Sequence, residues 1–267
     1  MPALARCLTL FRYVQAVTEG AVARIDQAGS YAVPSLRGEA FSVPPGAVAL
    51  RLDGAGVDAA VLVRDEEGGA VELRLLDAAG RTVHRGRLLS EGDRLLAGLV
   101  EGVGTAQGTP SGLRDLPGWE SGDQLAQFDA VLADGGLERH AGSHRYRDVD
   151  LSVVPAVFEH LCSVGLPVGV AVFVPGVMQA CAGPVHVTDV TVGGRLFVAL
   201  GQGSVEIDLA GVGSCRVVRS AGVHGPTSAL ELGDVHGRCV AMVTQFGVVG
   251  GEAHTAWENI SASLPGS

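Results

Sequence analysis

The chain has 267 residues, of which 47% are hydrophobic, 4% aromatic and 18% charged, and its formal net charge is -10. This length allows one large or two small domains with a sizeable core. The negative charge argues against a general nucleic-acid-binding protein, because such a protein needs a basic face to displace counterions. A local site lined by arginines remains open to small anionic ligands.

Other bulk features predict a cytoplasmic protein. The five cysteines form no C-x-x-C pair, which argues against a disulfide scaffold and against a zinc module. The first residues, "MPALARCLTLFRYVQ", lack the apolar run and the cleavage site of a signal peptide. No run of 18 apolar residues occurs, so we expect no membrane partner.

In chain order, the first 101 residues read as short strands that end in a helix. "GAVALRLD", "DAAVLVRD" and "GAVELRLLD" (residues 46–77) alternate apolar and polar residues and are separated by Gly and Asp turns. "SEGDRLLAGLVEG" predicts a helix with Ser90 as its N-cap. Residues 102–122 are rich in Gly, Pro and Ser and read as a linker.

Two helices are expected next, over residues 123–136 and 151–165, followed by a second series of strands that includes residues 194–218. The last helix is expected within residues 250–264. It places Ala256, Ile260 and Leu264 on one face and stops before Pro265.

The two strand series repeat each other. "AVELRLLDAAGRTV" (residues 70–83) and "ALELGDVHGRCVAMV" (residues 229–243) share A-x-E-L, a polar turn and G-R-x-V. Such self-similarity indicates a duplicated module. The sequence predicts an α+β fold of two tandem repeats of antiparallel β-sheet, each with a C-terminal helix, and with helices inserted before the second sheet. The expected units are 1–101, the linker 102–122, and 123–267. Further correspondences join residues 13–22 to 177–185, 47–65 to 204–220, and 90–99 to 251–264.

This pattern, together with "TSALELGDVHGRCVAMVTQFG", "AWENISASL" and "DQLAQFDAVLADGGLER", resembles the hemin-degrading and haem-trafficking family of HemS, ChuS and ChuX type. The resemblance extends over residues 8–264 and implies two stacked modules with haem in a cleft between a sheet and helices. It implies that Arg51 and Arg139 face the haem, where a guanidinium can pair with a propionate carboxylate. The family's axial histidine falls on Ala126 and its haem-facing tyrosine on Pro226, and the first-module helices are absent.

Because alanine cannot bind iron, other histidines become the candidate axial ligands of a haem cofactor. His140 and His144 stand at i, i+4 beside Arg139, and His224 lies in a loop near the family's haem-facing position. An arginine-rich solvated connector and a surface turn are the simpler interpretations of these two stretches. The remaining histidines are interpreted as structural: His84 and His186 as exposed or half-buried strand residues, His160 as a core residue, His236 in a turn and His254 on a helix surface. The cysteines in apolar runs are expected to be buried and inert.

Three functions remain open from the sequence. The first is a haem-binding protein, for trafficking or for haem-dependent chemistry with a non-standard axial ligand. The second is an enzyme, haem-dependent or haem-free, recruited from this scaffold to act on a small molecule. The third is an interaction module, or a protein that holds another small anionic ligand. No nucleotide-binding loop or hydrolase motif is present, and the oligomeric state stays open, with a homodimer as one candidate.

Overall fold

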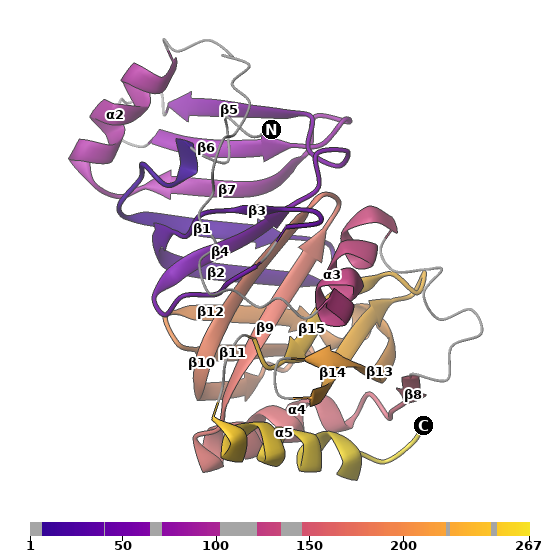
Figure 1. Ribbon diagram of the computed structural model, residues 1–267. Coiled ribbons are helices and arrows are strands. Elements are labelled where there is room, and N and C mark those ends of the chain that lie inside the picture. The colour runs from indigo at the N-terminus through magenta and orange to yellow at the C-terminus, as the bar shows by residue number, and fades with distance from the viewer. Residues whose placement is uncertain are drawn as a thin grey trace.

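The computed structural model describes residues 7–39, 41–64, 71–101, 122–134, 146–222, 225–246 and 250–267. Within these residues, fifteen strands form one continuous, mostly antiparallel sheet (Figure 1). The helices are α2 (Glu91–Glu101), α3 (Gly122–Asp134), α4 (Val153–Val164) and α5 (Gly251–Ser263). No helix in this described part of the chain is both long and apolar enough to cross a bilayer.

The strands fall into two series along the chain, one before α2 and one after α3. The first series is β1 (Val14–Glu19), β2 (Ala23–Tyr31), β3 (Ser35–Leu36), β4 (Ala47–Leu52), β5 (Ala59–Arg64), β6 (Val71–Leu76) and β7 (Thr82–Leu88). The second series is β8 (Tyr146–Asp148), β9 (Pro167–Val174), β10 (Val177–Val190), β11 (Arg195–Leu200), β12 (Gly203–Asp208), β13 (Val212–Gly222), β14 (Gly225–Asp234) and β15 (Cys239–Thr244). The spatial order is β5-β6-β7-β1-β2-β12-β11-β10-β9-β15-β14-β13-β8, and β4 pairs with β10, β2 and β3.

The two modules are joined by reciprocal strand pairing. β2 of the first module pairs with β12 of the second, with Ile25 opposite Val205. β4 of the first module pairs with β10 of the second, with Arg51 opposite Met178. Backbone hydrogen bonds along both junctions therefore fix the position of one module on the other, and they bring the end of β4 close to the turn between β9 and β10.

The repeated sequence motif forms the same turn in both modules. Asp77 directly follows β6 and Asp234 is the last residue of β14, and each carboxylate accepts a hydrogen bond of 2.9 Å from the backbone N–H of the arginine four residues later. The side-chain Nε of that arginine, Arg81 or Arg238, donates to the second carboxylate oxygen over 2.8 or 3.0 Å. The motif is therefore a turn that its own side chains hold closed.

One correspondence drawn from the sequence is wrong by one strand. Residues 13–22 were matched to residues 177–185, which belong to β10. In the structure β1 and β2 form a hairpin, and so do β9 and β10, so the counterpart of β1 is β9. An alternating apolar pattern is shared by successive strands and cannot tell them apart.

The predicted helices are confirmed at their expected places. The backbone N–H of Asp93 donates to the Ser90 Oγ over 3.0 Å, which is the expected N-cap of α2. Gly165, with a φ of 64°, ends α4 in the left-handed conformation that favours glycine. Ala256 and Ile260 of α5, and Leu264 directly after it, pack against the core and so share one face, as predicted.

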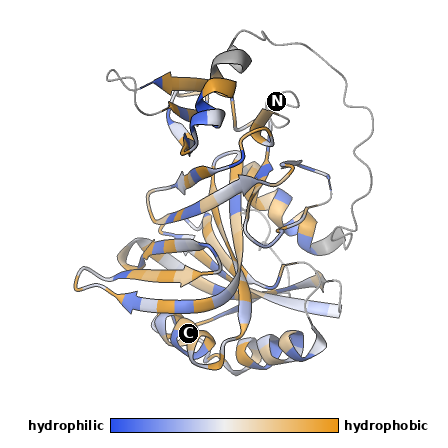
Figure 2. Cartoon of the chain, turned by 90° about the vertical axis from the view of Figure 1, so that its left-hand side faces the viewer, coloured by the Kyte–Doolittle hydropathy of each residue, from blue (hydrophilic) through white to orange (hydrophobic). Residues whose placement is uncertain are grey.

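The central strand β9 of the second module is covered on both faces, whereas β6 of the first module is polar on one face. β9 is buried on both faces except at Pro167, because α3 packs on one side and α4 on the other. β6 instead alternates buried Val71 and Leu73 with half-buried Glu72 and Arg74. Apolar residues accordingly dominate the central strands in Figure 2. On β6, the charged side chains of Glu72 and Arg74 thus lie on the face opposite the core.

Candidate functional site

α3 lies over the second-module sheet and against the first module, and this contact is named here the α3 junction (Figure 1). The apolar side of α3 enters a cluster of four aromatic rings. Phe128, fully buried, has ring centroids 5.7 Å from Phe246 and 6.4 Å from both Phe41 and Phe173. The predicted amphipathic pattern of this helix is confirmed, and side chains fill the space between α3 and the sheet.

Arg51 reaches the α3 junction from β4 and is completely buried. Its Nε and Nη2 donate to the two carboxylate oxygens of Asp129 on α3, over 2.7 and 2.9 Å. Its Nη1 donates to the Ser35 Oγ over 3.0 Å and to the Glu39 backbone carbonyl over 2.8 Å. The arginine that the resemblance placed against haem is therefore paired with an internal carboxylate of α3.

Asp129 was not singled out from the sequence. Its carboxylate also accepts a hydrogen bond of 3.0 Å from the backbone N–H of Gly38. It therefore ties α3 both to β4 and to the segment after β3. An aspartate in the middle of an amphipathic helix gives no sign of a partner 78 residues earlier in the chain, so only the tertiary structure could identify it.

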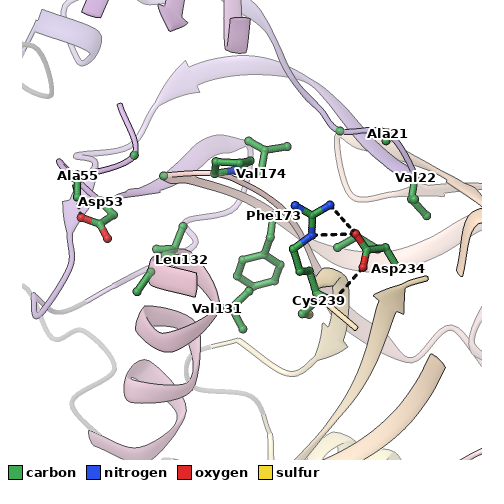
Figure 3. Close-up of a pocket in the computed structure, with 17 residues that line it drawn as sticks. Ala21, Val22, Asp53, Ala55, Val131, Leu132, Phe173, Val174, Asp234 and Cys239 are labelled. Atoms are coloured by element: carbon green, nitrogen blue, oxygen red, sulfur yellow. Dashed lines mark hydrogen bonds and ion pairs between the residues drawn. The ribbon is translucent and has the colours of Figure 1, made fainter. Parts of the chain in front are cut away.

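A cavity of about 340 Å³ opens at the C-terminal end of α3 (Figure 3). Four turns or loops border it: the β1–β2 turn, the loop after β4, the β9–β10 turn and the β14–β15 turn. Its apolar wall includes Val22, Val131, Leu132, Phe173 and Val174. Both modules and α3 therefore contribute to one cavity.

The charged groups of the cavity are paired. Asp234 is held by Arg238 at 2.9 Å, and Asp53 lies 3.5 Å from Arg37. Burial alone would raise the pKa of Asp234, but hydrogen bonds from the Arg238 backbone and side chain and from the His236 backbone keep it below its usual value. The half-exposed Arg238 guanidinium is the cation on this wall that can turn toward a ligand carboxylate.

Two of the histidine interpretations are wrong. His84, expected to be exposed or half-buried, is completely buried and bonded at both ring nitrogens, because β1, β2 and β10 enclose it. His160, expected in the core, is exposed, because α4 turns Phe158 and Leu161 inward instead. The surface positions of His186 and His236 agree with expectation, whereas His254, expected on a helix surface, is half-buried.

The other cofactor candidates, Arg139, His140, His144 and His224, lie outside the described residues. Among the residues that are described, no three His, Cys, Asp or Glu side chains gather into a metal site. Cys181 and Cys215 are buried, as predicted, and burial raises the pKa of each thiol to about 12, so neither is a reactive thiolate. Cys239 lies on the cavity wall, and its thiol donates to the Ala241 carbonyl over 3.5 Å.

Ala126, the position matched to the family's axial histidine, lies on the exposed side of α3, one turn before Asp129. The departure from the family pattern therefore falls on the same helix that carries the Arg51 partner. The residue at this position cannot bind iron, because the alanine side chain has no ligand atom.

No family model matches the chain, and no curated protein matches its sequence. Solved structures do match. PhuS, a heme-binding protein from Pseudomonas aeruginosa, superposes with a TM-score of 0.76 at 20% identity, covering 100% of this chain and 85% of PhuS. The heme-degrading enzyme ChuS of Escherichia coli O157:H7 superposes with a TM-score of 0.75 at 17% identity, covering 98% of this chain and 84% of ChuS. The resemblance drawn from the sequence is thus confirmed at the level of the fold: the chain has the two-module α+β fold of PhuS and ChuS.

Proposed function

We propose that this chain binds haem at the α3 junction and serves in haem trafficking. The observation that carries the proposal is the position of Arg51. On a fold shared with two haem proteins, a buried guanidinium pairs with α3, and the C-terminal end of the same helix lines an apolar cavity. Guanidinium groups bind carboxylates in a bidentate manner and keep their charge when buried, which suits a haem propionate.

The residues present fit the organic part of haem. The apolar wall of the cavity suits a porphyrin ring, and its volume of about 340 Å³ lies at the lower end of ordinary ligand pockets, which span roughly 300–1,000 Å³. Haem would therefore have to enlarge the cavity, and α3 is the element that would move. Arg51 and Arg238 would hold the propionates, and we propose Arg139 as a third cation, because it follows α3 closely in sequence.

We propose His140 or His144 as the axial ligand in preference to His224. His140 stands six residues after Asp134, the end of α3 that borders the cavity, and six residues span at most about 20 Å. His224 stands between the ends of β13 and β14, whereas the cavity borders Asp234, nine residues along β14 from Gly225. Nine strand residues extend about 30 Å. His224 is therefore the weaker candidate for this cavity.

A hemin titration followed by absorbance tests the proposal. We expect a saturable Soret band at one haem per chain. We expect His140→Ala or His144→Ala to change the shape of the band, and Arg139→Ala to weaken binding with the shape kept. His186→Ala, which removes an exposed histidine of β10, is the matched control and should leave the hemin affinity and the shape of the Soret band unchanged. The absence of any saturable band in the wild-type protein would overturn the proposal.

A second candidate function is the binding of a smaller carboxylate ligand without iron. The aromatic cluster of Phe41, Phe128, Phe173 and Phe246 favours it, because these rings fill the space between α3 and the sheet. This function predicts that hemin gives no saturable band, and that small aromatic carboxylates nevertheless raise the thermal unfolding midpoint. An enzyme working through haem is distinguished from a carrier by exchangeable or five-coordinate ligation together with turnover.

A further inference from the structure

The Arg51–Asp129 pair has the geometry that a ligand carboxylate would adopt. Two parallel N–H···O bonds of 2.7 and 2.9 Å join the guanidinium to both carboxylate oxygens. We propose that the Asp129 side chain stands in for a ligand carboxylate, so that a ligand enters the α3 junction only by exchanging its own carboxylate for Asp129 on Arg51. This inference rests on the proposed haem site. It adds that the site selects ligands that carry a carboxylate, and that Asp129 sets this selectivity.

The burial of Arg51 makes the exchange obligatory. Its side chain has no exposed surface, and a buried guanidinium that loses its counterion is strongly destabilising. A ligand that displaced Asp129 without bringing a carboxylate would leave this charge unpaired. A ligand that brings one keeps the charge paired throughout, and the Ser35 and Glu39 hydrogen bonds to Nη1 are not disturbed.

The position of Asp129 allows its carboxylate to be displaced from Arg51. About a sixth of its side chain is exposed, whereas its partner is completely buried, so its carboxylate can reach water when released. Its second bond, from the Gly38 N–H, means that release also separates α3 from the segment after β3. The helix remains held elsewhere, by Phe128 in the aromatic cluster and by the 3.0 Å bond from the Gln124 side chain to the Thr244 hydroxyl. Exchange therefore loosens one side of α3 without detaching it.

Asp129→Asn tests the exchange. Asparagine keeps an acceptor for the Gly38 N–H but cannot neutralise Arg51, so the resting protein no longer competes with the ligand. The apparent dissociation constant equals the intrinsic one divided by the fraction of open sites, so removing a dominant closed state tightens binding by at least about tenfold. The matched control is Glu72→Gln, which makes the same charge change in the Glu72–Arg74 pair of β6 and leaves hemin affinity unchanged.

Hemin and hemin dimethyl ester are the two probes, because the ester keeps the iron and the ring and lacks both carboxylates. We expect the wild-type protein to bind hemin at least tenfold more tightly than the ester. The double variant Arg51→Met/Asp129→Leu replaces the buried pair with apolar groups, a change that proteins often tolerate. It should bind hemin no more tightly than the wild type and should lose much of its preference over the ester, which tests the inference even if Asp129→Asn does not fold.

The failures of this inference and of the proposed function are distinguishable. Equal hemin affinity of the wild type and Asp129→Asn, or equal affinity of hemin and its ester for the wild type, overturns the exchange and leaves haem binding intact. Binding of hemin to Asp129→Asn but not to the wild type also overturns the exchange, because hemin would then fail to displace Asp129 from Arg51. Absence of hemin binding in every variant overturns both.

Discussion

The Tyr31 hydroxyl lies 2.8 Å from His84 Nε2 in the buried region between β2 and β7. On the other side of the ring, His84 Nδ1 lies 2.8 Å from the Thr18 hydroxyl, which itself donates to the Gln179 side-chain oxygen over 2.8 Å. Because Thr18 has only one proton to give, we assign the ring proton to Nδ1, and Nε2 accepts from Tyr31. The network is thus complete only when His84 is neutral. It ties the first module to β10 of the second.

This network predicts that acid destabilises the protein. Burial lowers the pKa of His84 to about 3, against 6.5 for an exposed histidine, and raises that of Tyr31. Below pH 6.5 the unfolded chain therefore binds a proton that the folded chain does not, and stability falls by up to about 1.4 kcal/mol per pH unit. Between pH 6.5 and pH 5 we expect a loss of about 2 kcal/mol from this group, measured by urea unfolding at each pH.

Two variants isolate the contribution of His84. His84→Gln keeps hydrogen-bonding capacity and cannot titrate, so the slope of stability between pH 5 and 6.5 should decrease by the amount assigned to His84. His186→Gln removes an exposed histidine and should leave the slope as it is in the wild type. An unchanged slope in His84→Gln would mean that His84 does not cause the acid sensitivity.

Trp257 anchors α5 to the second-module sheet. Its ring is completely buried, and Nε1 donates a 2.7 Å hydrogen bond to the Ser228 carbonyl on β14. We expect Trp257→Ala to lower the free energy of unfolding by about 3–5 kcal/mol through the cavity it leaves. Trp257→Phe keeps most of the packing and should cost less, about 1–3 kcal/mol, because it mainly removes one of the two hydrogen bonds that the Ser228 carbonyl accepts, the other coming from the Thr244 hydroxyl. Equal costs would place the contribution in the hydrogen bond rather than in packing.

The two matching turns offer a direct test of the repeat. Asp77→Ala removes the bonds to the Ala79 and Arg81 N–H groups, and Asp234→Ala removes the equivalent bonds to His236 and Arg238. We expect both variants to lower the thermal unfolding midpoint by similar amounts, measured by calorimetry. A large effect at one turn and none at the other would show that the two turns differ in their importance for stability.

Placing a histidine at the position where the family has one should strengthen haem binding. Ala126 is exposed on α3, so Ala126→His should cost the helix little, about 0.5 kcal/mol. If the proposed site is correct, the variant should bind hemin more tightly and shift the Soret band toward histidine ligation. Ala156→His places a histidine at an exposed position of α4, which packs on the other face of the sheet, and serves as the control. Identical spectra for Ala126→His and the wild type would count against haem at the α3 junction.

Local patterns determined much of the secondary structure. The apolar alternation of "GAVELRLLD", the Ser90 N-cap and the Gly165 stop each depend on neighbouring residues, so they could be read directly. The repeated G-R motif predicted two equivalent turns for the same reason. The pattern was ambiguous where successive strands look alike, which is why β1 was matched to β10 instead of β9.

The sequence by itself determined that two β-rich modules would form, that α3 would bury one apolar face, and that Arg51 would stand in a strand of the first module. Only the tertiary structure decided which strands of the two modules pair with each other, that His84 is buried and His160 exposed, and that Asp129 pairs with Arg51. The physical reason is the distance along the chain over which each interaction acts. Strand, cap and turn preferences act over a few residues, whereas a buried ion pair depends on where two distant segments meet after the whole sheet has assembled.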